Sequence, residues 1–133
     1  MLKSFKVIFI LSCVLWITQP VFAKGEGWDN LNRQVVGLYQ SGQYLAAIPI
    51  AQEAVKAAEQ TFGGNHPNVA ISLTNLAMLY DTQKRYSESL PLYERALQIR
   101  IQTLGPENLS TAESLSNLRS EERRVGKECR SRW

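Results

Sequence analysis

The chain is poor in the residues that build disulfides, metal sites and nucleophilic catalytic centres. Its 133 residues include two cysteines and one histidine. Cys13 and Cys129 lie near opposite ends, so residues 24–118 contain no cysteine. A disulfide framework, a cysteine-based zinc site and a cysteine–histidine nucleophile pair are therefore excluded for that central part. With 44% hydrophobic and 20% charged residues, the composition predicts one small globular domain.

The centre of the chain also lacks an excess of positive charge, although the whole chain has a formal net charge of +3. Residues 24–118 contain seven basic and nine acidic residues, a net charge of −2. The basic excess lies in residues 1–23 and 119–133. Nucleic-acid surfaces need clustered lysine and arginine, so we predict no nucleic-acid partner. A basic nucleic-acid binder remains a hypothesis that depends entirely on residues 119–133.

Residues 1–23 have the order of a secretory signal peptide. Two lysines precede an uncharged apolar run at residues 7–17, and Val21 and Ala23 provide the small residues of a cleavage site. The run is about half as long as a transmembrane span requires, so a permanent anchor is disfavoured. A lipoprotein signal before Cys13 is an alternative that leaves little apolar run. We expect export to a bacterial periplasm or the cell exterior, with no stable membrane span after cleavage.

Residues 119–133 differ from the rest in charge density and in having no apolar period. Their sequence, RSEERRVGKECRSRW, is similar to the translation of a widely used short-read sequencing adapter in reverse complement, and all 15 residues agree. We therefore predict a non-native, adapter-derived tail. The native protein is then expected to continue beyond Leu118 with other residues.

The central part repeats itself. Residues 44–76 align with residues 86–118 after a shift of 42 positions, and 11 of the 33 positions are identical. The identical pairs include Tyr44/Tyr86, Pro49/Pro91, Ala54/Ala96, Gly63/Gly105, Ala70/Ala112, Leu73/Leu115, Asn75/Asn117 and Leu76/Leu118. Self-similarity at a fixed period of this length predicts a solenoid of stacked units.

Apolar spacing within each period predicts two helices per unit. We expect helices over about 29–40, 44–62, 68–82 and 86–104, with short turns at 41–43 and 83–85. Gly63 and Gly105 suit helix C-termini, and Pro49 and Pro91 are expected as tolerated kinks. The residues expected to face inward are Val69, Leu73, Leu76, Ala77, Tyr80, Leu90, Tyr93, Ala96, Leu97 and Ile101.

Residues 72–108, SLTNLAMLYDTQKRYSESLPLYERALQIRIQTLGPEN, resemble the 42-residue tetratricopeptide repeat of the kinesin-light-chain type. The resemblance rests on Leu76-Ala77, Leu79-Tyr80, Tyr86, Pro91-Leu92-Tyr93, Arg95-Ala96-Leu97, Leu104-Gly105 and His66-Pro67. It implies an all-α, right-handed superhelical solenoid, with units at about 28–67 and 68–109 and a partial unit at 110–118. The first unit is one residue shorter at its turn, and Arg119 stands where the repeat should have alanine.

Residues suited to catalysis are scarce in residues 24–118. His66 precedes Pro67 at a helix entrance and has no acid–base partner in sequence, so we predict a turn or cap residue. Gly63-Gly64 lacks the Gly-Lys-Ser/Thr ending of a phosphate loop. We expect no enzyme activity, cofactor or metal site.

A ladder of polar side chains suggests binding instead. Asn75 and Asn117 hold the same position in successive first helices, Gln34 holds the corresponding one in the first unit, and Ser72 and Ser114 lie one turn earlier. Carboxamides at repeat spacing can hydrogen-bond an extended peptide. In related repeats, by resemblance, asparagines here line the concave groove. They can equally cap interhelical carbonyls or face water, and Met78 is expected to serve packing.

These observations predict a non-enzymatic scaffold that binds a protein or peptide on the concave face. The alternative is the N-terminal interaction module of a larger exported enzyme, such as one with a caspase-like peptidase domain beyond Leu118. About two and a quarter repeats without a polar cap leave an apolar face open, so self-association through the repeat ends is also expected.

Overall fold

The structure, a computed structural model, describes residues 26–131 as an all-α chain of five helices. These are α1 (Glu26–Gln40), α2 (Tyr44–Phe62), α3 (Pro67–Thr82), α4 (Tyr86–Leu104) and α5 (Leu109–Ser131). No strand occurs in this range. The predicted fold class is confirmed, and four helices lie where the apolar spacing placed them. The expected signal peptide lies outside the described residues.

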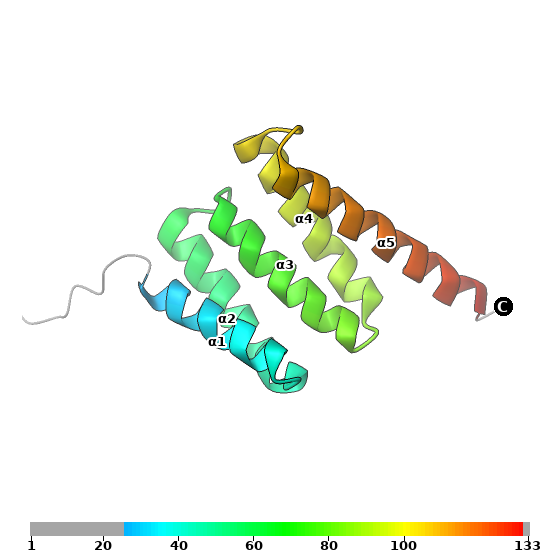
Figure 1. Ribbon diagram of the computed structural model, residues 1–133, viewed down its shortest axis with the longest axis horizontal. Helices are drawn as coiled ribbons and strands as arrows, with labels where there is room; N and C mark the ends of the chain where they lie inside the picture. The colour runs from blue at the N-terminus through cyan, green and yellow to red at the C-terminus, as the bar shows by residue number, and fades with distance from the viewer. Residues whose placement is uncertain (1–25, 132–133) are drawn as a thin grey trace, which may run out of the picture.

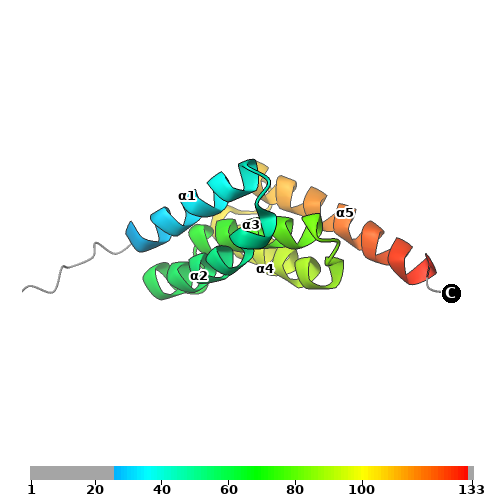
Figure 2. The ribbon, with the colours of Figure 1, turned by 90° about the horizontal axis from the view of Figure 1, so that it is seen from below.

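The helices stack in chain order as antiparallel pairs (Figure 1). Helix α1 packs on α2, α2 on α3, α3 on α4 and α4 on α5. Seen from below, α1 and α5 lie on one side of the molecule, α2 and α4 lie on the other, and α3 lies between them (Figure 2). This is the layered arrangement of an α-solenoid, in which each pair contacts only its neighbours.

Both turns inside the helix pairs use a left-handed residue at the same repeat position. Gly42 has φ +75° and Lys84 has φ +57°. The next residue closes each turn, because the backbone N–H of Gln43 donates to Leu38 O at 2.9 Å and that of Arg85 donates to Tyr80 O at 2.9 Å. The backbone path of the turn is thus the same in both units, with lysine in place of glycine. The expectation that the first unit is one residue shorter at its turn is wrong, because Leu38, and not Tyr39, is equivalent to Tyr80.

The ends of the helices confirm the predicted stop and cap residues. Gly63 and Gly105 terminate α2 and α4 with φ of +87° and +86°, a region that glycine enters without a side-chain penalty. His66 caps α3, since its Nδ1 accepts from the backbone N–H of Asn68 at 3.1 Å, and Pro67 is the first helical residue. Helices α2 and α4 continue through their internal prolines.

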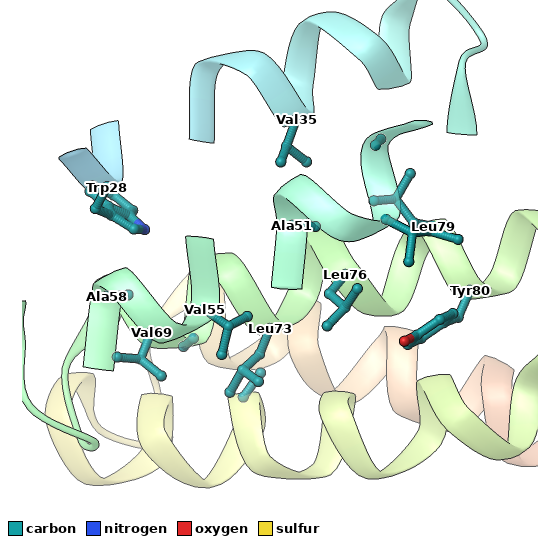
Figure 3. Close-up of a cluster of buried hydrophobic side chains, with 14 of the residues drawn as sticks. Trp28, Val35, Ala51, Val55, Ala58, Val69, Leu73, Leu76, Leu79 and Tyr80 are labelled. Atoms are coloured by element: carbon teal, nitrogen blue, oxygen red, sulfur yellow. The ribbon is translucent and has the colours of Figure 1, made fainter. Parts of the chain in front are cut away.

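The hydrophobic core lies mainly between α2 and α3 (Figure 3). Trp28 and Val35 of α1 and Ala96 and Ile99 of α4 complete it. Helix α3 is buried on most of its surface, and Leu73 is only 1% exposed. Trp28 anchors α1 to this core: its indole Nε1–H donates to Ser72 Oγ at 2.7 Å, and its ring meets Phe62 edge-on. Small residues at the contacts, such as Ala51 and Ala58, allow the helices to approach closely.

One predicted core position is wrong. Ile101 is exposed, and Ile99 is the isoleucine of α4 that is buried. Ile101 aligns with Glu59 of α2, which forms an ion pair with Arg95 of the following unit. No described helix follows α5 to cover Ile101 in the same way, so its side chain meets solvent.

Helix α5 continues without a break through Leu118 to Ser131. Its buried side chains are polar: Thr111, Ser114 and Glu121. The exposed Cys129 is also helical. Helical geometry does not distinguish a native segment from an adapter-derived one, so the origin of residues 119–133 stays a prediction.

Candidate functional site

Helices α1, α3 and α5 contain the predicted binding residues, and the surface that these three helices form is here called the inner face. These are the first helices of successive units. Two cavities open between them. They share Tyr39 of α1 and Met78 of α3, so they form adjoining parts of one surface.

The three predicted carboxamides differ in their surroundings. Asn75 is half-buried, and its Nδ2 donates to Asn32 Oδ1 of α1 at 2.8 Å. Gln34 is exposed and donates to Asn30 Oδ1 within its own helix at 2.7 Å. Asn117 is half-buried and lines the cavity that reaches α5. The carboxamide that meets Asn75 is thus Asn32, which the 42-residue alignment did not identify.

The two predicted serines lie within the helix interfaces. Ser72 is buried, accepts from Trp28 Nε1, and donates to Asn68 O at 3.1 Å. Ser114 is also buried, accepts from Arg100 Nη1, and donates to Ser110 O at 2.8 Å. Burial lowers the pKa of Arg100. Both hydroxyl groups are satisfied internally, so neither is free to contact a ligand on the inner face.

An apolar cavity of about 300 Å³ lies between α1 and α3. Its lining is Val35, Val36, Tyr39, Gln40, Asn75 and Met78. Val36 is exposed and Met78 half-buried, so part of the apolar lining is accessible. Gln40 and Asn75 place amide groups at the edge of this apolar surface. The volume and lining suit one apolar side chain, with hydrogen bonds beside it.

A second, more polar cavity of about 440 Å³ lies between the C-terminal end of α3 and helices α4 and α5. Its lining includes the polar residues Asp81, Tyr86, Tyr93 and Arg124, together with Thr82, Asn117 and Ser120. The Tyr93 hydroxyl donates to Asp81 Oδ2 at 3.0 Å. Burial and the negative charge of Asp81 raise the pKa of Tyr93, so its phenol stays protonated and acts as a donor.

No cluster of three potential metal ligands occurs among the described residues. His66 serves as the α3 cap and stacks on Phe62 with ring centroids 4.7 Å apart. Within the described range, no helix is both long and apolar enough to span a bilayer.

Comparison with known protein families agrees with this architecture. The tetratricopeptide repeat profile matches residues 31–102, which is more than half of the chain. The chain belongs to the tetratricopeptide repeat family. Repeats of this family generally mediate protein–protein interactions. A comparison with curated proteins gives no match.

Two features of the tetratricopeptide repeat site were not predicted from the sequence. Asn32 was missed because the alignment of units placed Gln34 opposite Asn75. Met78 was assigned to packing, yet it lines both cavities. No signal in the sequence indicated this, because the partial exposure of Met78 beside the buried Ala77 and Leu79 is visible only in the structure.

Proposed function

We propose that this protein binds a peptide segment of a partner protein on its inner face, without catalysis. The observation that carries this proposal is the accessible apolar cavity beside Asn75. An apolar side chain of the partner fills the cavity and excludes water, which contributes most of the free energy. Asn75, Gln34 and Asn117 hydrogen-bond the partner's backbone and fix its direction.

The hydrogen bond between Asn75 and Asn32 supports this arrangement. It uses one amide N–H of Asn75 and holds the side chain in place across α1 and α3. Among the described residues, the Asn75 carbonyl oxygen accepts no hydrogen bond, so it is available to a peptide N–H. A carboxamide already fixed by its neighbour loses little side-chain entropy on binding.

Three finer assignments form part of the same proposal. The repeats are of the kinesin-light-chain type, on the motifs from Leu76 to Gly105. The protein is exported, on the signal-like order of residues 1–23. Residues 119–133 are adapter-derived and are not part of the native binding surface.

The position of Glu121 supports the last assignment. Glu121 aligns with Leu79 of the preceding unit, and both side chains are buried. Burial and the nearby Asp81 raise the pKa of Glu121, so its charged form is disfavoured there. A repeat sequence would place an apolar residue at this core position. A buried carboxyl group at this position is therefore more consistent with a non-native segment than with a native repeat.

The test is peptide selection on the chain expressed from Lys24 onward, followed by titration of the selected peptides against variants. Val36→Lys places a flexible charge at the mouth of the apolar cavity, and Asn75→Ala removes the proposed backbone contact. We expect each to weaken binding by about tenfold or more, the loss of one buried apolar or hydrogen-bonded contact.

Lys56→Ala is the matched control, because Lys56 lies exposed on α2 and pairs only with Glu53 of its own helix. It should leave the affinity within about twofold. Failure to select any peptide, or selected peptides that bind equally well to Val36→Lys and Asn75→Ala, would overturn the proposal.

A further inference from the structure

The cavity beside α5 contains a carboxylate that the fold leaves incompletely satisfied. Asp81 Oδ2 accepts from the Tyr93 hydroxyl, whereas Asp81 Oδ1 is buried and accepts from no N–H or hydroxyl group among residues 26–131. The carboxyl group of Glu121, whose pKa Asp81 raises, lies beside it. Burying a carboxylate oxygen without a partner is costly. Such an atom marks a place where a donor from another molecule would be favourable.

Arg124 occupies this cavity loosely. Its Nη1 lies 3.4 Å from Asp81 Oδ2 and 3.1 Å from Glu121 Oε2, and its guanidinium carbon lies 5.8 Å from the centre of the Tyr86 ring. The side chain remains half exposed. The 3.4 Å contact with Asp81 and the half-exposed side chain show that the guanidinium reaches the cavity without filling it, and its Nη1 makes no contact with Asp81 Oδ1.

The lining matches a cationic side chain in charge and in shape. Asp81 supplies the negative charge, and the Tyr86 ring offers a face for a cation. Tyr93, protonated, holds the Asp81 carboxylate in one orientation. The other nearby cation, Arg85, is engaged outside the cavity with Glu88 and the Tyr80 ring.

We propose that the cavity formed by Asp81, Tyr86 and Tyr93 is a subsite for an arginine or lysine side chain of the bound partner. The proposal rests on the inner-face binding proposed above and names its specificity. The subsite adjoins the apolar cavity through Tyr39 and Met78. The partner therefore carries an apolar residue and a basic residue close together. In the present chain Arg124 reaches into the subsite and competes with the partner.

The experiment uses a single capped amino acid as the probe, so that binding to the subsite is measured separately from binding of an extended peptide. N-acetyl-arginine amide and its neutral isostere N-acetyl-citrulline amide are titrated, with NMR detection, into the Arg124→Ala variant of the chain from Lys24 onward. We expect the arginine probe to bind roughly three- to fivefold more tightly than the citrulline probe, the size of one partly exposed charge pair with a cation–π contact.

The double variant Arg124→Ala/Asp81→Asn is the control, since asparagine keeps an oxygen that accepts from Tyr93 and Glu121 stays in place. It should abolish the preference for arginine, and an unchanged amide spectrum elsewhere shows that it is folded. Tyr86→Leu in the Arg124→Ala background should reduce the preference without removing it. Equal binding of the two probes to Arg124→Ala, or a preference that survives Asp81→Asn, would overturn the proposal.

The outcome is separable from that of the peptide experiment. Selected peptides that lack basic residues, combined with no arginine preference, remove the subsite and leave inner-face binding intact. An arginine preference that depends on Asp81, in a protein for which no peptide can be selected, keeps the subsite and removes the peptide-binding function.

Discussion

Helices α3 and α5 hold the same place in successive repeat units but bury different kinds of side chain. Helix α3 buries Leu73, Leu76 and Leu79, whereas the buried residues of α5 are Thr111, Ser114 and Glu121. Up to Leu118 the two sequences align, and Leu115 and Leu118 match Leu73 and Leu76. Beyond Leu118, the apolar period of α3 has no counterpart in α5.

The difference separates two physical effects. Leu115 is 48% exposed while its counterpart Leu73 is 1% exposed, because α3 is covered by α4 and no described helix covers α5 in that way. Glu121 is different, since the fold buries it as fully as Leu79 and the side chain is unsuited to the position. A missing neighbour explains the first case, and an incompatible sequence explains the second.

The largest effect is expected from truncating the matched leucines. Leu73→Ala should lower the free energy of unfolding by about 2–5 kcal/mol, because it leaves a cavity in the core. Leu115→Ala should cost less than about 1 kcal/mol, because much of that side chain is already in water. Urea unfolding followed by circular dichroism measures both. Equal losses would show that α5 is buried as α3 is.

Restoring the apolar pattern should stabilise the chain. Glu121→Leu replaces a buried carboxyl group with the residue found at the equivalent position 79, and we expect a gain of about 1–3 kcal/mol. Glu122→Leu at the exposed neighbouring position is the control and should change stability by less than about 0.5 kcal/mol. A loss of stability in Glu121→Leu would mean that the carboxyl group is a favourable part of α5.

The same residue should make stability depend on pH. Burial and Asp81 raise the pKa of Glu121 in the folded state, so folding favours the protonated carboxyl. This contribution is fully present below the unfolded-state pKa of about 4.3 and is lost as the pH rises through the folded-state value.

Glu121→Gln isolates this contribution, because glutamine cannot ionise. The stability advantage of Glu121→Gln over the unsubstituted chain should grow from pH 4 to pH 7, measured by urea unfolding at each pH. A constant difference, or one that shrinks with rising pH, would contradict the assigned direction.

The smallest effect on stability concerns the uncovered apolar residues near the end of the array. Leu109 is largely exposed at the start of α5, and Leu115 lies further along the same helix. The double variant Leu109→Ser/Leu115→Ser should weaken self-association, measured by sedimentation velocity, while unfolding changes by less than about 1 kcal/mol. Leu45→Ser, equally exposed on α2, is the control and should leave association unchanged. Weaker self-association in Leu45→Ser, with no change in the double variant, would place the self-association contact on the α2 side of the molecule instead.

Helix bounds could be predicted closely because local physics fixes them. Gly63, Gly105 and the His66-Pro67 pair set helix ends through backbone conformation and capping, which depend on neighbouring residues alone. The apolar stripe of α3 was also predictable, since the 3.6-residue spacing determines which face is buried.

The binding face was harder to predict because it depends on how the helices are offset against one another. A shift of 42 residues aligns Asn75 with Arg33, and pairing Tyr39 with Tyr80 aligns it with Gln34. The offset of α1 against α3 instead brings Asn32 to Asn75. The helical spacing likewise places Ser72 one turn from Asn75. It does not reveal that Trp28, 44 residues from Ser72, donates a hydrogen bond to the Ser72 hydroxyl and covers it. Contacts between helices distant in sequence decide both cases.

The most direct test of the claim that the repeat is interrupted at Leu118 is to sequence the source DNA across codon 118 with a single long read. We expect the adapter-like codons to be missing there and the frame to continue with alanine and the apolar residues of a third repeat. A catalytic domain further downstream would make these repeats the interaction arm of an exported enzyme. Finding RSEERRVGKECRSRW encoded in the genome itself would contradict the claim.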